Sequence, residues 1–505
     1  MFVLEAIRDY AKTGRVALIN REERLTFSEL DARSEAFAAY LLKKFGDDRT
    51  PILIYGQKET DFLSCIFGAL KSGRGYVPID RTVPADRAAQ IAEDIKPQVV
   101  VDFGGFTAET EGEILTPQDL NKIFSGGGQV SPSYWISGNT PAYILFTSGS
   151  TGKPKGVPIT VNNLAAFYRG ILPQYPAEEG GIILHQISYS FDVSGCSLYV
   201  GLSRGMTLFT VDHGMLEDMG QLFSALGQSE LTFWVSTPSF GELCVQSGRF
   251  TEELLPRLKN FLFCGEVLTH TLCDTLAQRF PKARVLNTYG PTEATVLVTA
   301  AEVTEEMRRD SRPIPIGQPI PGARLLLVDQ AGRPVEEDEE PGELYILGPS
   351  VGPGYLERPD LTEKAFFTDT ATGLRGYRTG DICYRRRGVY YYCGRADNQL
   401  KLNGFRIEIE DVENNLQKLS NVARAAVVPV WEGEKVQYLA AFLLLKEPDG
   451  LTPLKRSIQL KKEAAQYLPG YMIPRRILTV DAFPLNVNGK VDKKALACQL
   501  KGAKA

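Results

Sequence analysis

Apolar residues in the first 300 positions alternate between short continuous runs and a helical spacing. The runs at 51–55 and 97–102 are typical of buried strands. Leu25–Leu30 opens a helix for which Thr26 or Ser28 is the expected cap. The alternation continues, and further strands are expected at 182–185, 206–210, 233–235, 261–264 and 285–286. The pattern predicts an α/β fold in which helices cover parallel sheets.

The pattern changes near Arg324 and again near residue 397. After Arg324, strands joined by turns predict a small β-rich subdomain with strands at 325–329, 342–347 and 388–392. After residue 397 a helix precedes a hairpin at 422–445, and a second helix ends at Pro469, with its apolar face marked by Leu454, Ile458, Ala465 and Leu468. We therefore predict a large N-terminal domain at 1–396 and a small α+β C-terminal domain at 397–505.

A loop rich in hydroxyl groups and glycine joins two apolar segments, Tyr143–Phe146 and Val157–Val161. Small residues and lysines of this kind can donate to phosphate oxygens at close approach. The spacing differs from that of the nucleotide-hydrolase P-loop, because only two residues separate Gly149 from Gly152. A flexible linker is the alternative for such a run, but the flanking apolar segments favour a tight connection between strands. The candidate phosphate-binding residues are Thr147, Ser148, Gly149, Ser150, Thr151, Gly152, Lys153 and Lys155.

Composition narrows the function classes. The 505 residues carry 56 basic and 61 acidic side chains, a net charge of −5, so neither nucleic acid nor an anionic membrane is an expected partner. Eight scattered cysteines and three histidines give no zinc-binding or disulfide pattern. No signal-peptide core or membrane-spanning run is found, and we expect a cytoplasmic enzyme without membrane insertion.

Five motifs in a fixed order carry a specific resemblance. They are the loop at 145–157, Asn287–Glu293, Tyr377–Asp381, Gly394–Lys401 with Asn403–Glu408, and Asn488–Lys490. Over nearly the whole chain they resemble the adenylate-forming superfamily, which includes acyl-CoA synthetases, luciferases and the adenylation domains of nonribosomal peptide synthetases. The segments 236–240, 261–268, 348–356 and 468–474 are most similar to D-alanine:D-alanyl carrier protein ligases, which supply D-alanine for teichoic acid modification.

The resemblance implies an ATP site that uses Mg²⁺. A carboxylate substrate is already ionised, so its attack on the α-phosphorus needs in-line positioning and charge neutralisation more than a base. Besides the loop, the implied ATP-binding residues are Asn287, Thr288, Tyr289, Gly290, Thr292, Asp381, Arg395 and Lys490, and the implied metal-binding residue is Glu293. For Asp381 and Arg395 the alternative is an ion pair at the surface near a turn.

Amino-acid selectivity is expected to depend on Asp192. A buried α-ammonium group requires a paired anion, and Asp192 matches the position that supplies it in amino-acid-activating members. The alternative is that Asp192 caps a helix. Gly195 and Cys196 are smaller than the residues typical of the ligases. The expected side-chain pocket consists of Val193, Cys196, Ser236, Leu262, Cys264, Thr288 and Val296, with Cys264 packing against the substrate and not acting as a nucleophile.

By the same resemblance Lys490 is the catalytic residue of adenylation and Asp397 is a hinge, although Asp397 capping a turn is the alternative. Because no carrier module with a serine follows Lys490 in the sequence, we expect transfer to a separate carrier protein with a phosphopantetheine thiol. The resulting hypothesis is an AMP-forming ligase that activates D-alanine. Alternatives are a stand-alone adenylation enzyme for another small amino acid, a luciferase-type oxidoreductase, and a non-catalytic nucleotide-binding protein.

Overall fold

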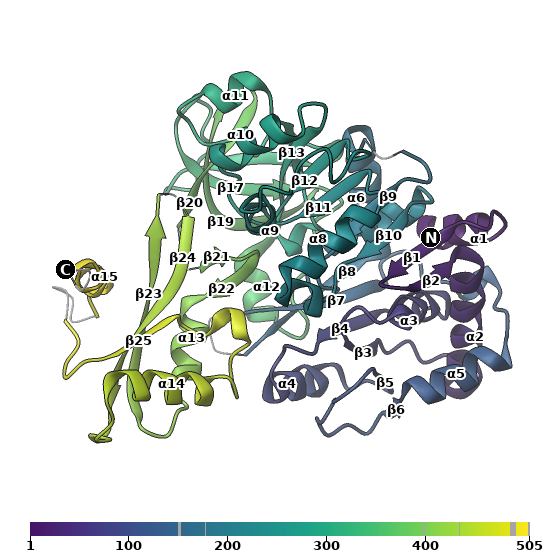
Figure 1. The fold of residues 1–505 in the computed structure, drawn as a ribbon, viewed down its shortest axis with the longest axis horizontal. Helices are drawn as coiled ribbons and strands as arrows, with labels where there is room; N and C mark the ends of the chain where they lie inside the picture. Colours follow the sequence, from purple (N-terminus) through teal and green to yellow (C-terminus); the bar gives the residue numbers. More distant parts are fainter. Residues whose placement is uncertain (150–152, 177, 397–398, 434, 485–490, 503–505) are drawn as a thin grey trace.

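The computed structural model describes residues 1–149, 153–176, 178–396, 399–433, 435–484 and 491–502. The predictions for Ser150, Thr151, Gly152, Asp397 and Lys490 therefore lie outside the described residues. The fold is α/β, as the sequence predicts, with parallel sheets, a smaller β-rich region and a compact C-terminal region (Figure 1).

The first sheet carries the predicted phosphate loop. Its strands run in the order β6-β5-β3-β4-β7-β8 and all neighbours are parallel except β7 and β8, which form an antiparallel hairpin. The strands are β3 (Ile52–Gly56), β4 (Tyr76–Asp80), β5 (Val99–Asp102), β6 (Glu113–Leu115), β7 (Pro141–Thr147) and β8 (Lys155–Thr160). The predicted connection between two strands is confirmed, because β7 and β8 pair up to Thr147 and Lys155. The helices of this region are α2 (Phe27–Phe45), α3 (Thr60–Lys71), α4 (Ala85–Ile95) and α5 (Pro117–Gly126).

Thr26 is the N-cap of α2, one of the two predicted caps. Its hydroxyl accepts from the Glu29 N–H at 3.1 Å, and the Glu29 carboxylate accepts from the Thr26 N–H at 2.8 Å. This reciprocal arrangement is a capping box, which satisfies two N–H groups at the start of the helix.

The second sheet runs in the order β15-β14-β13-β12-β11-β9-β10-β1-β2, with a parallel central part. Its strands are β1 (Val16–Asn20), β2 (Glu23–Thr26), β9 (Ile182–His185), β10 (Thr207–Thr210), β11 (Phe233–Ser236), β12 (Asn260–Phe263), β13 (Arg284–Tyr289), β14 (Thr299–Glu302) and β15 (Gln318–Pro319). Its helices include α1 (Phe2–Tyr10), α6 (Val161–Ile171), η3 (Cys196–Gly201), α7 (His213–Glu217), α8 (Met219–Gln228), α9 (Pro238–Val245), α10 (His270–Arg279) and α11 (Glu305–Arg309).

A third, largely antiparallel sheet forms the predicted β-rich region. It contains β16 (Arg324–Val328), β17 (Gly342–Leu347), β18 (Phe366–Thr368), β19 (Arg375–Arg386) and β20 (Val389–Arg395), and helix α12 (Pro359–Ala365) precedes β18. Cores of buried apolar side chains extend through the N-terminal sheets and this region.

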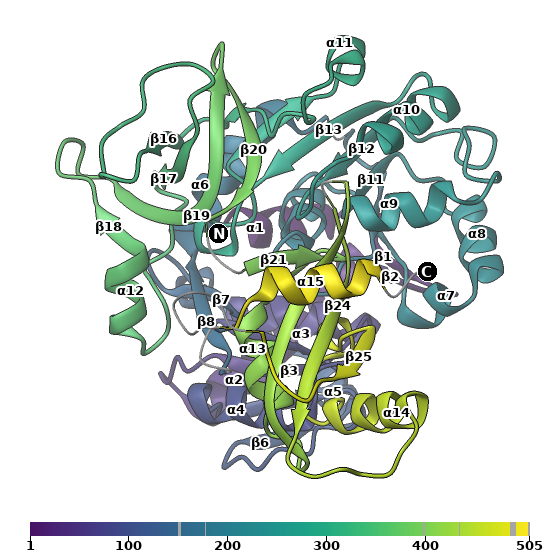
Figure 2. The ribbon, with the colours of Figure 1, turned by 90° about the vertical axis from the view of Figure 1, so that its left-hand side faces the viewer.

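The C-terminal region has an apolar core of its own, which is consistent with the predicted second domain. Its elements are β21 (Gln399–Leu402), β22 (Phe405–Glu408), α13 (Ile409–Leu416), β23 (Val422–Glu432), β24 (Lys435–Leu445), α14 (Pro453–Ala464), β25 (Arg476–Thr479) and α15 (Lys493–Gly502). Figure 1 shows β23–β25 at the end of the molecule opposite the N-terminus, with β21 and β22 between them and the larger part. In Figure 2 the C-terminal region faces the viewer and α15 crosses in front of β24.

One part of the predicted C-terminal pattern is wrong. Leu454 and Ile458 are 72% and 61% exposed, so they do not mark the buried face of α14. The core instead takes Leu460 and Ala464 from the helix. The second helix also ends at Ala464, before the predicted end at Pro469. In the described part of the chain, no helix is long and apolar enough to cross a membrane.

Candidate active site

Candidate phosphate-binding residues lie where β7 ends and where β8 begins. Thr147 closes β7, and its buried hydroxyl oxygen has no hydrogen-bond partner among the described residues. Gly149 has no space for a side chain, since an added Cβ would overlap the carbonyl oxygen of Lys153. Lys153 is exposed, whereas Lys155 at the start of β8 is buried. Of the predicted loop residues described, Thr147, Ser148 and Lys155 therefore line the interior.

Residues from β22 occupy the interior end of this hairpin. Ser148 donates its hydroxyl to the carbonyl oxygen of Arg406 at 2.9 Å and accepts from the Glu408 N–H at 3.2 Å. The Lys155 ammonium forms an ion pair with the Glu408 carboxylate at 3.3 Å. Burial and the nearby Arg406 charge lower the pKa of Lys155.

Glu293 lies in the short helix η4 (Thr292–Ala294) and is fully buried. Arg406 Nη1 donates to both of its carboxylate oxygens, at 2.9 and 2.8 Å, and the Tyr355 hydroxyl donates to Oε1 at 2.8 Å. Burial alone would raise the pKa of Glu293, but the charges of Arg406 and Lys155 lower it to about 2. The carboxylate is therefore ionised and paired.

This geometry bears on the predicted Mg²⁺ site. Both oxygens of Glu293 already accept hydrogen bonds, and the described residues contain no cluster of three or more His, Cys, Asp or Glu suited to a metal ion. In this arrangement the residues do not fit a bound magnesium ion. The role of Glu293 in metal binding stays a prediction.

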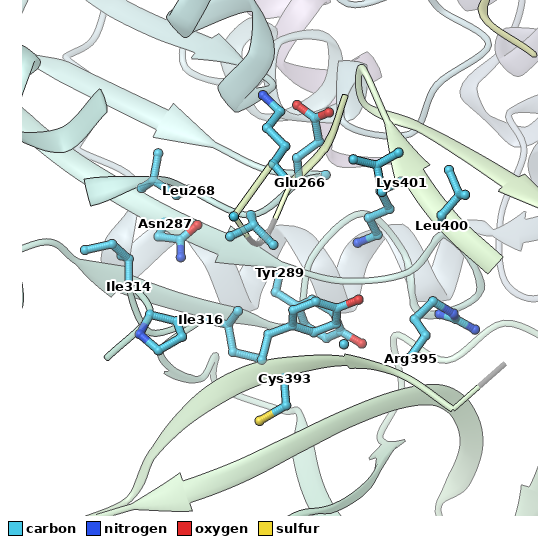
Figure 3. A pocket seen from close by; sticks show the side chains of 18 of the residues that line it. Glu266, Leu268, Asn287, Tyr289, Ile314, Ile316, Cys393, Arg395, Leu400 and Lys401 are labelled. Atoms are coloured by element: carbon cyan, nitrogen blue, oxygen red, sulfur yellow. The ribbon is translucent and has the colours of Figure 1, made fainter. Parts of the chain in front are cut away.

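A cavity of about 590 Å³ lies between β13, β20 and the C-terminal region (Figure 3). Asn287, Thr288 and Tyr289 line one side, and Arg395 and Lys401 line another. The Lys401 ammonium lies 5.3 Å from the centre of the Tyr289 ring. The apolar wall consists of Leu268, Ile314, Ile316, Leu400 and Val436. A cavity with one apolar wall and a few polar groups can bind a ligand that has a flat ring and polar groups at one end.

Asp381 and Arg395 form an ion pair of 2.7 Å, but the pair is buried, so the alternative of a surface pair is wrong. The Tyr289 hydroxyl donates to the other oxygen of Asp381, and Arg395 Nη2 donates to the Thr379 carbonyl oxygen at 3.0 Å. Burial raises the pKa of Tyr289 well above its usual value, so the hydroxyl stays protonated. These bonds fix the Asp381 carboxylate beside the cavity.

Gly290, which follows Tyr289, lies close to the backbone of Val296 and Leu297 and has no room for a Cβ.

Asp192 is buried, 5% exposed, and has no ion pair in the described part of the chain. Burial raises its pKa to about 6, and a hydrogen bond from the Thr292 side chain partly offsets that rise. Asp192 does not cap the π-helix η3 that follows, because the N-cap of η3 is Gly195. A buried carboxylate that lacks an ion pair is costly even with the hydrogen bond from Thr292, which makes Asp192 a candidate partner for a cationic ligand.

The predicted pocket residues around Asp192 are all buried. They are Val193, Cys196, Ser236, Leu262, Cys264, Thr288 and Val296. Burial raises the pKa of the Cys264 thiol to about 11, so it is protonated at neutral pH, in line with packing and not with nucleophilic attack. The Ser236 hydroxyl accepts from Trp234 Nε1 at 2.8 Å and donates to the Thr237 carbonyl oxygen at 2.9 Å. Val296 has φ of 69°, a strained value for a β-branched residue.

The sequence motifs do not point to a role for Arg406, Glu408 or Tyr355. Arg406 and Glu408 belong to the motif Asn403–Glu408, which is the signal in the sequence that could have identified them. Arg406 and Glu408 both bond to the nearby Gln399, but the contacts with Glu293 and Lys155 span more than 60 positions of the chain, and no local pattern identifies them.

Comparisons with known proteins agree with this architecture. A family model described as AMP-binding enzyme matches residues 7–356, and one described as AMP-binding enzyme C-terminal domain matches residues 411–490. A D-alanine--D-alanyl carrier protein ligase of Bacillus anthracis is 39% identical over 504 residues, covering 99% of this chain and 100% of that protein. One of Bacillus cereus is also 39% identical, over 505 residues, with coverage of 99% and 100%.

Solved structures show the same fold. The Vibrio cholerae adenylation domain AlmE in complex with glycyl-adenosine-5'-phosphate aligns with a TM-score of 0.85 and 23% identity, over 99% of this chain and 97% of that chain. Holo-PA1221, an NRPS protein containing adenylation and PCP domains, aligns with a TM-score of 0.84 and 25% identity, over 98% and 84%. This chain therefore belongs to the AMP-binding enzyme family and is similar over its full length to D-alanine--D-alanyl carrier protein ligases.

Proposed function

We propose that this chain is an ATP-dependent ligase that activates D-alanine and transfers it to the phosphopantetheine thiol of a separate carrier protein. In the first step a carboxylate oxygen of the amino acid bonds to the α-phosphorus of ATP, the bond to the β-phosphate oxygen breaks, and pyrophosphate leaves. In the second step the carrier thiolate attacks the acyl carbon, and AMP leaves with the electron pair of the broken bond.

The amino-acid assignment depends on the burial of the Asp192 carboxylate. Its carboxylate is buried without an ion pair in the described part of the chain, and an α-ammonium group would supply the missing charge. The small side chains of Cys196 and Cys264 are buried near Asp192, which supports a small amino acid. The names of the curated relatives make D-alanine the first choice.

The nucleotide assignment has separate support. The orphan hydroxyl of Thr147 and the cavity beside Tyr289 and Asp381 suit the phosphates and the nucleoside of ATP. Glu293 stays the predicted Mg²⁺ ligand of the sequence motifs, although Arg406 occupies both of its carboxylate oxygens in the arrangement described.

A second candidate is the activation of another small amino acid by the same two steps. Gly195 favours it, because the ligases typically have a bulkier residue at this position, whereas here an added Cβ would lie only 3.2 Å from Val296 Cγ2. ATP–pyrophosphate exchange with D-alanine, L-alanine, glycine and L-serine separates the candidates. We expect the highest kcat/KM for D-alanine, and exchange with D-alanine no faster than with the other three would reject the assignment.

Transfer is tested separately by mass spectrometry of a purified carrier protein after incubation with enzyme, ATP and D-alanine. We expect a mass increase of one D-alanyl group on the phosphopantetheinylated carrier. The apo-carrier, which lacks the thiol, is the control and should not change.

Two residues outside the described part have proposed roles. Lys490→Ala is expected to abolish adenylate formation and to leave transfer from prepared aminoacyl-adenylate intact, since a lysine that stabilises the pentavalent phosphate serves only the first step. Asp397→Pro is expected to slow transfer more than exchange, because proline fixes φ at a hinge. Unchanged single-turnover rates for both steps would reject the hinge.

A further inference from the structure

A second cavity, of about 290 Å³, lies beside the phosphate loop and is lined by an excess of positive charge. Gly149 and Lys155 form its inner side, and α12 and β19 form its outer side. Six basic side chains line it, against one carboxylate, Glu343; the basic residues are Lys155, Arg358, Lys364, Arg378, Arg395 and Arg406.

Four of the six cations are neutralised by carboxylates outside the lining. The ion pairs are Lys155–Glu408 at 3.3 Å, Arg358–Asp360 at 3.1 Å, Arg395–Asp381 at 2.7 Å and Arg406–Glu293 at 2.8 Å. Lys364 and Arg378 have no ion pair in the described part of the chain. Glu343 accepts from the Gly380 N–H at 3.1 Å. After all pairs are counted, the outer side of the cavity keeps an excess of positive charge.

Arg378 is held in place although it has no carboxylate partner. Its guanidinium carbon lies 4.7 Å from the centre of the Phe367 ring, and Nη1 donates to the Lys364 carbonyl oxygen at 3.0 Å. Stacking on an aromatic face leaves the edge of a guanidinium group available for hydrogen bonds. Lys364 lies in the same helix turn that accepts this bond, so the two cations lie at one wall.

Two phosphate-binding candidates of the neighbouring loop already have partners within the protein. Ser148 and Lys155 bind residues 406–408 in this arrangement, whereas the adjoining cavity presents Lys364 and Arg378 to an anion near the loop. A condensed phosphate matches this site, since it carries several negative charges and many acceptor oxygens for Lys and Arg donors.

We infer that Lys364 and Arg378, together with Arg358, form a pyrophosphate-binding subsite that receives the product after it has left the phosphate loop. This inference rests on the proposed function for the origin of the pyrophosphate. It adds residues of α12 and β19 to the site, none of which the sequence motifs assigned to phosphate. The same condensed-phosphate chemistry is found in the terminal phosphates of ATP, and the test distinguishes the two sources.

The test variant is the double substitution Lys364→Gln and Arg378→Gln. The matched control is Arg333→Gln with Arg385→Gln, which also removes two cations from the same sheet region and breaks the ion pairs with Asp329 and Asp338 and the hydrogen bond from Arg385 to the Glu336 carbonyl oxygen. Binding of ³²P-labelled pyrophosphate and of ATP is measured by equilibrium dialysis at fixed ionic strength, without amino acid. This measurement does not require adenylation. It therefore tests the subsite even if the proposed function is wrong.

We expect the double variant to bind pyrophosphate about tenfold more weakly and ATP within about twofold of the unmodified protein, while the control pair leaves both unchanged. In the exchange assay the KM for pyrophosphate should rise by the same factor, with the KM for ATP unchanged. If the binding of ATP and of pyrophosphate weakened equally, the two cations would belong to the ATP site and the inference would be wrong. Pyrophosphate affinity equal to that of the control pair would overturn it as well.

Arg378 also packs on Phe367, so a folding defect must be separated from lost binding. Lys364→Gln alone changes an exposed position of α12, and its melting temperature should match that of the unmodified protein. We expect this single variant to weaken pyrophosphate binding about threefold. Unchanged pyrophosphate affinity in this folded variant would reject the role of Lys364.

Discussion

At the scale of single residues, the carboxyl group of Asp192 dominates the electrostatics of the proposed amino-acid pocket. Burial raises its pKa from 3.8 to about 6, so the group loses its charge at a pH at which exposed aspartates keep theirs. An ammonium ligand requires the ionised form. Amino-acid binding is therefore expected to be fully present above about pH 7 and to weaken as the pH falls through 6.

The first prediction concerns this pH dependence. Below pH 6 the apparent KM for D-alanine in the exchange reaction should rise by about tenfold per pH unit, because the fraction of ionised Asp192 falls at that rate. Asp192→Asn should lower kcat/KM for the amino acid by roughly 100-fold or more and should remove this pH dependence. Asp212→Asn, at an exposed ion pair with Arg21, is the control. A variant with wild-type KM at pH 7 would contradict the role.

The second prediction compares two buried tyrosines. Tyr76 and Tyr199 share a hydrogen bond of 2.8 Å, whereas the Tyr143 hydroxyl has no partner among the described residues. Tyr199→Phe should lower the free energy of unfolding by about 1 kcal/mol, and Tyr143→Phe should leave it unchanged or raise it, because an unpaired buried hydroxyl is unfavourable. Chemical denaturation of the ligand-free protein measures both. A larger loss for Tyr143→Phe would show that its hydroxyl has a partner in solution.

At the scale of elements, the hairpin of β21 and β22 joins the C-terminal region to the phosphate loop. Its turn, Asn403-Gly404, has positive φ at both residues, as expected for a tight hairpin turn. Gly404 also approaches Thr237 closely, since an added Cβ would lie 2.5 Å from Thr237 Cγ2. The glycine thus serves both the turn and the docking of the hairpin.

The third prediction separates these two effects. Gly404→Ala should slow transfer to the carrier by about tenfold or more and leave exchange largely intact, because the methyl group pushes the docked hairpin away from Thr237. Gly388→Ala is the matched control, since Gly388 has a similar φ of 79° but nothing within 4 Å of an added Cβ. Both changes share the backbone cost of about 1–2 kcal/mol. Equal single-turnover transfer rates for the two variants would contradict a docking role.

At the scale of the whole molecule, buried ion pairs connect the predicted N-terminal and C-terminal domains. Arg87 in α4 pairs with Asp411 in α13 at 3.2 Å, and both side chains are buried. Burial raises the pKa of Asp411, although the Arg87 charge opposes the rise. With the Arg406–Glu293 and Lys155–Glu408 pairs, this contact stabilises the arrangement in which residues 406–408 cover the phosphate loop.

The fourth prediction tests that contribution. Asp411→Asn should weaken the arrangement by up to about 3–5 kcal/mol, because it leaves the Arg87 guanidinium buried and unpaired. Transfer to the carrier should slow, exchange should persist, and proteolysis near residue 397 should become faster. A double-mutant cycle with Arg87→Gln should return a coupling energy of about 0.5–3 kcal/mol. A coupling energy near zero would mean that the pair does not hold the two regions together.

Much of the fold could be predicted from local signals. The runs at 51–55 and 97–102 became strands, Thr26 became a cap, and the loop between Phe146 and Val157 became a hairpin, because strand propensity, capping and turn formation depend on neighbouring residues. The exposed Leu454 and Ile458 show the limit of such signals. Helical spacing indicates a face, but the surrounding elements decide whether that face is buried.

Periodicity and short motifs specify the α/β class, the hairpin of β7 and β8 and the residue types of the candidate site. Which charges meet depends instead on how the whole chain folds. Glu293 was predicted as a metal ligand, yet it pairs with Arg406, 113 positions away. Lys364 and Arg378 became part of one cationic cavity because α12 packs against β19. Charge pairing depends on distances between segments remote in the chain, and packing of the whole molecule fixes those distances.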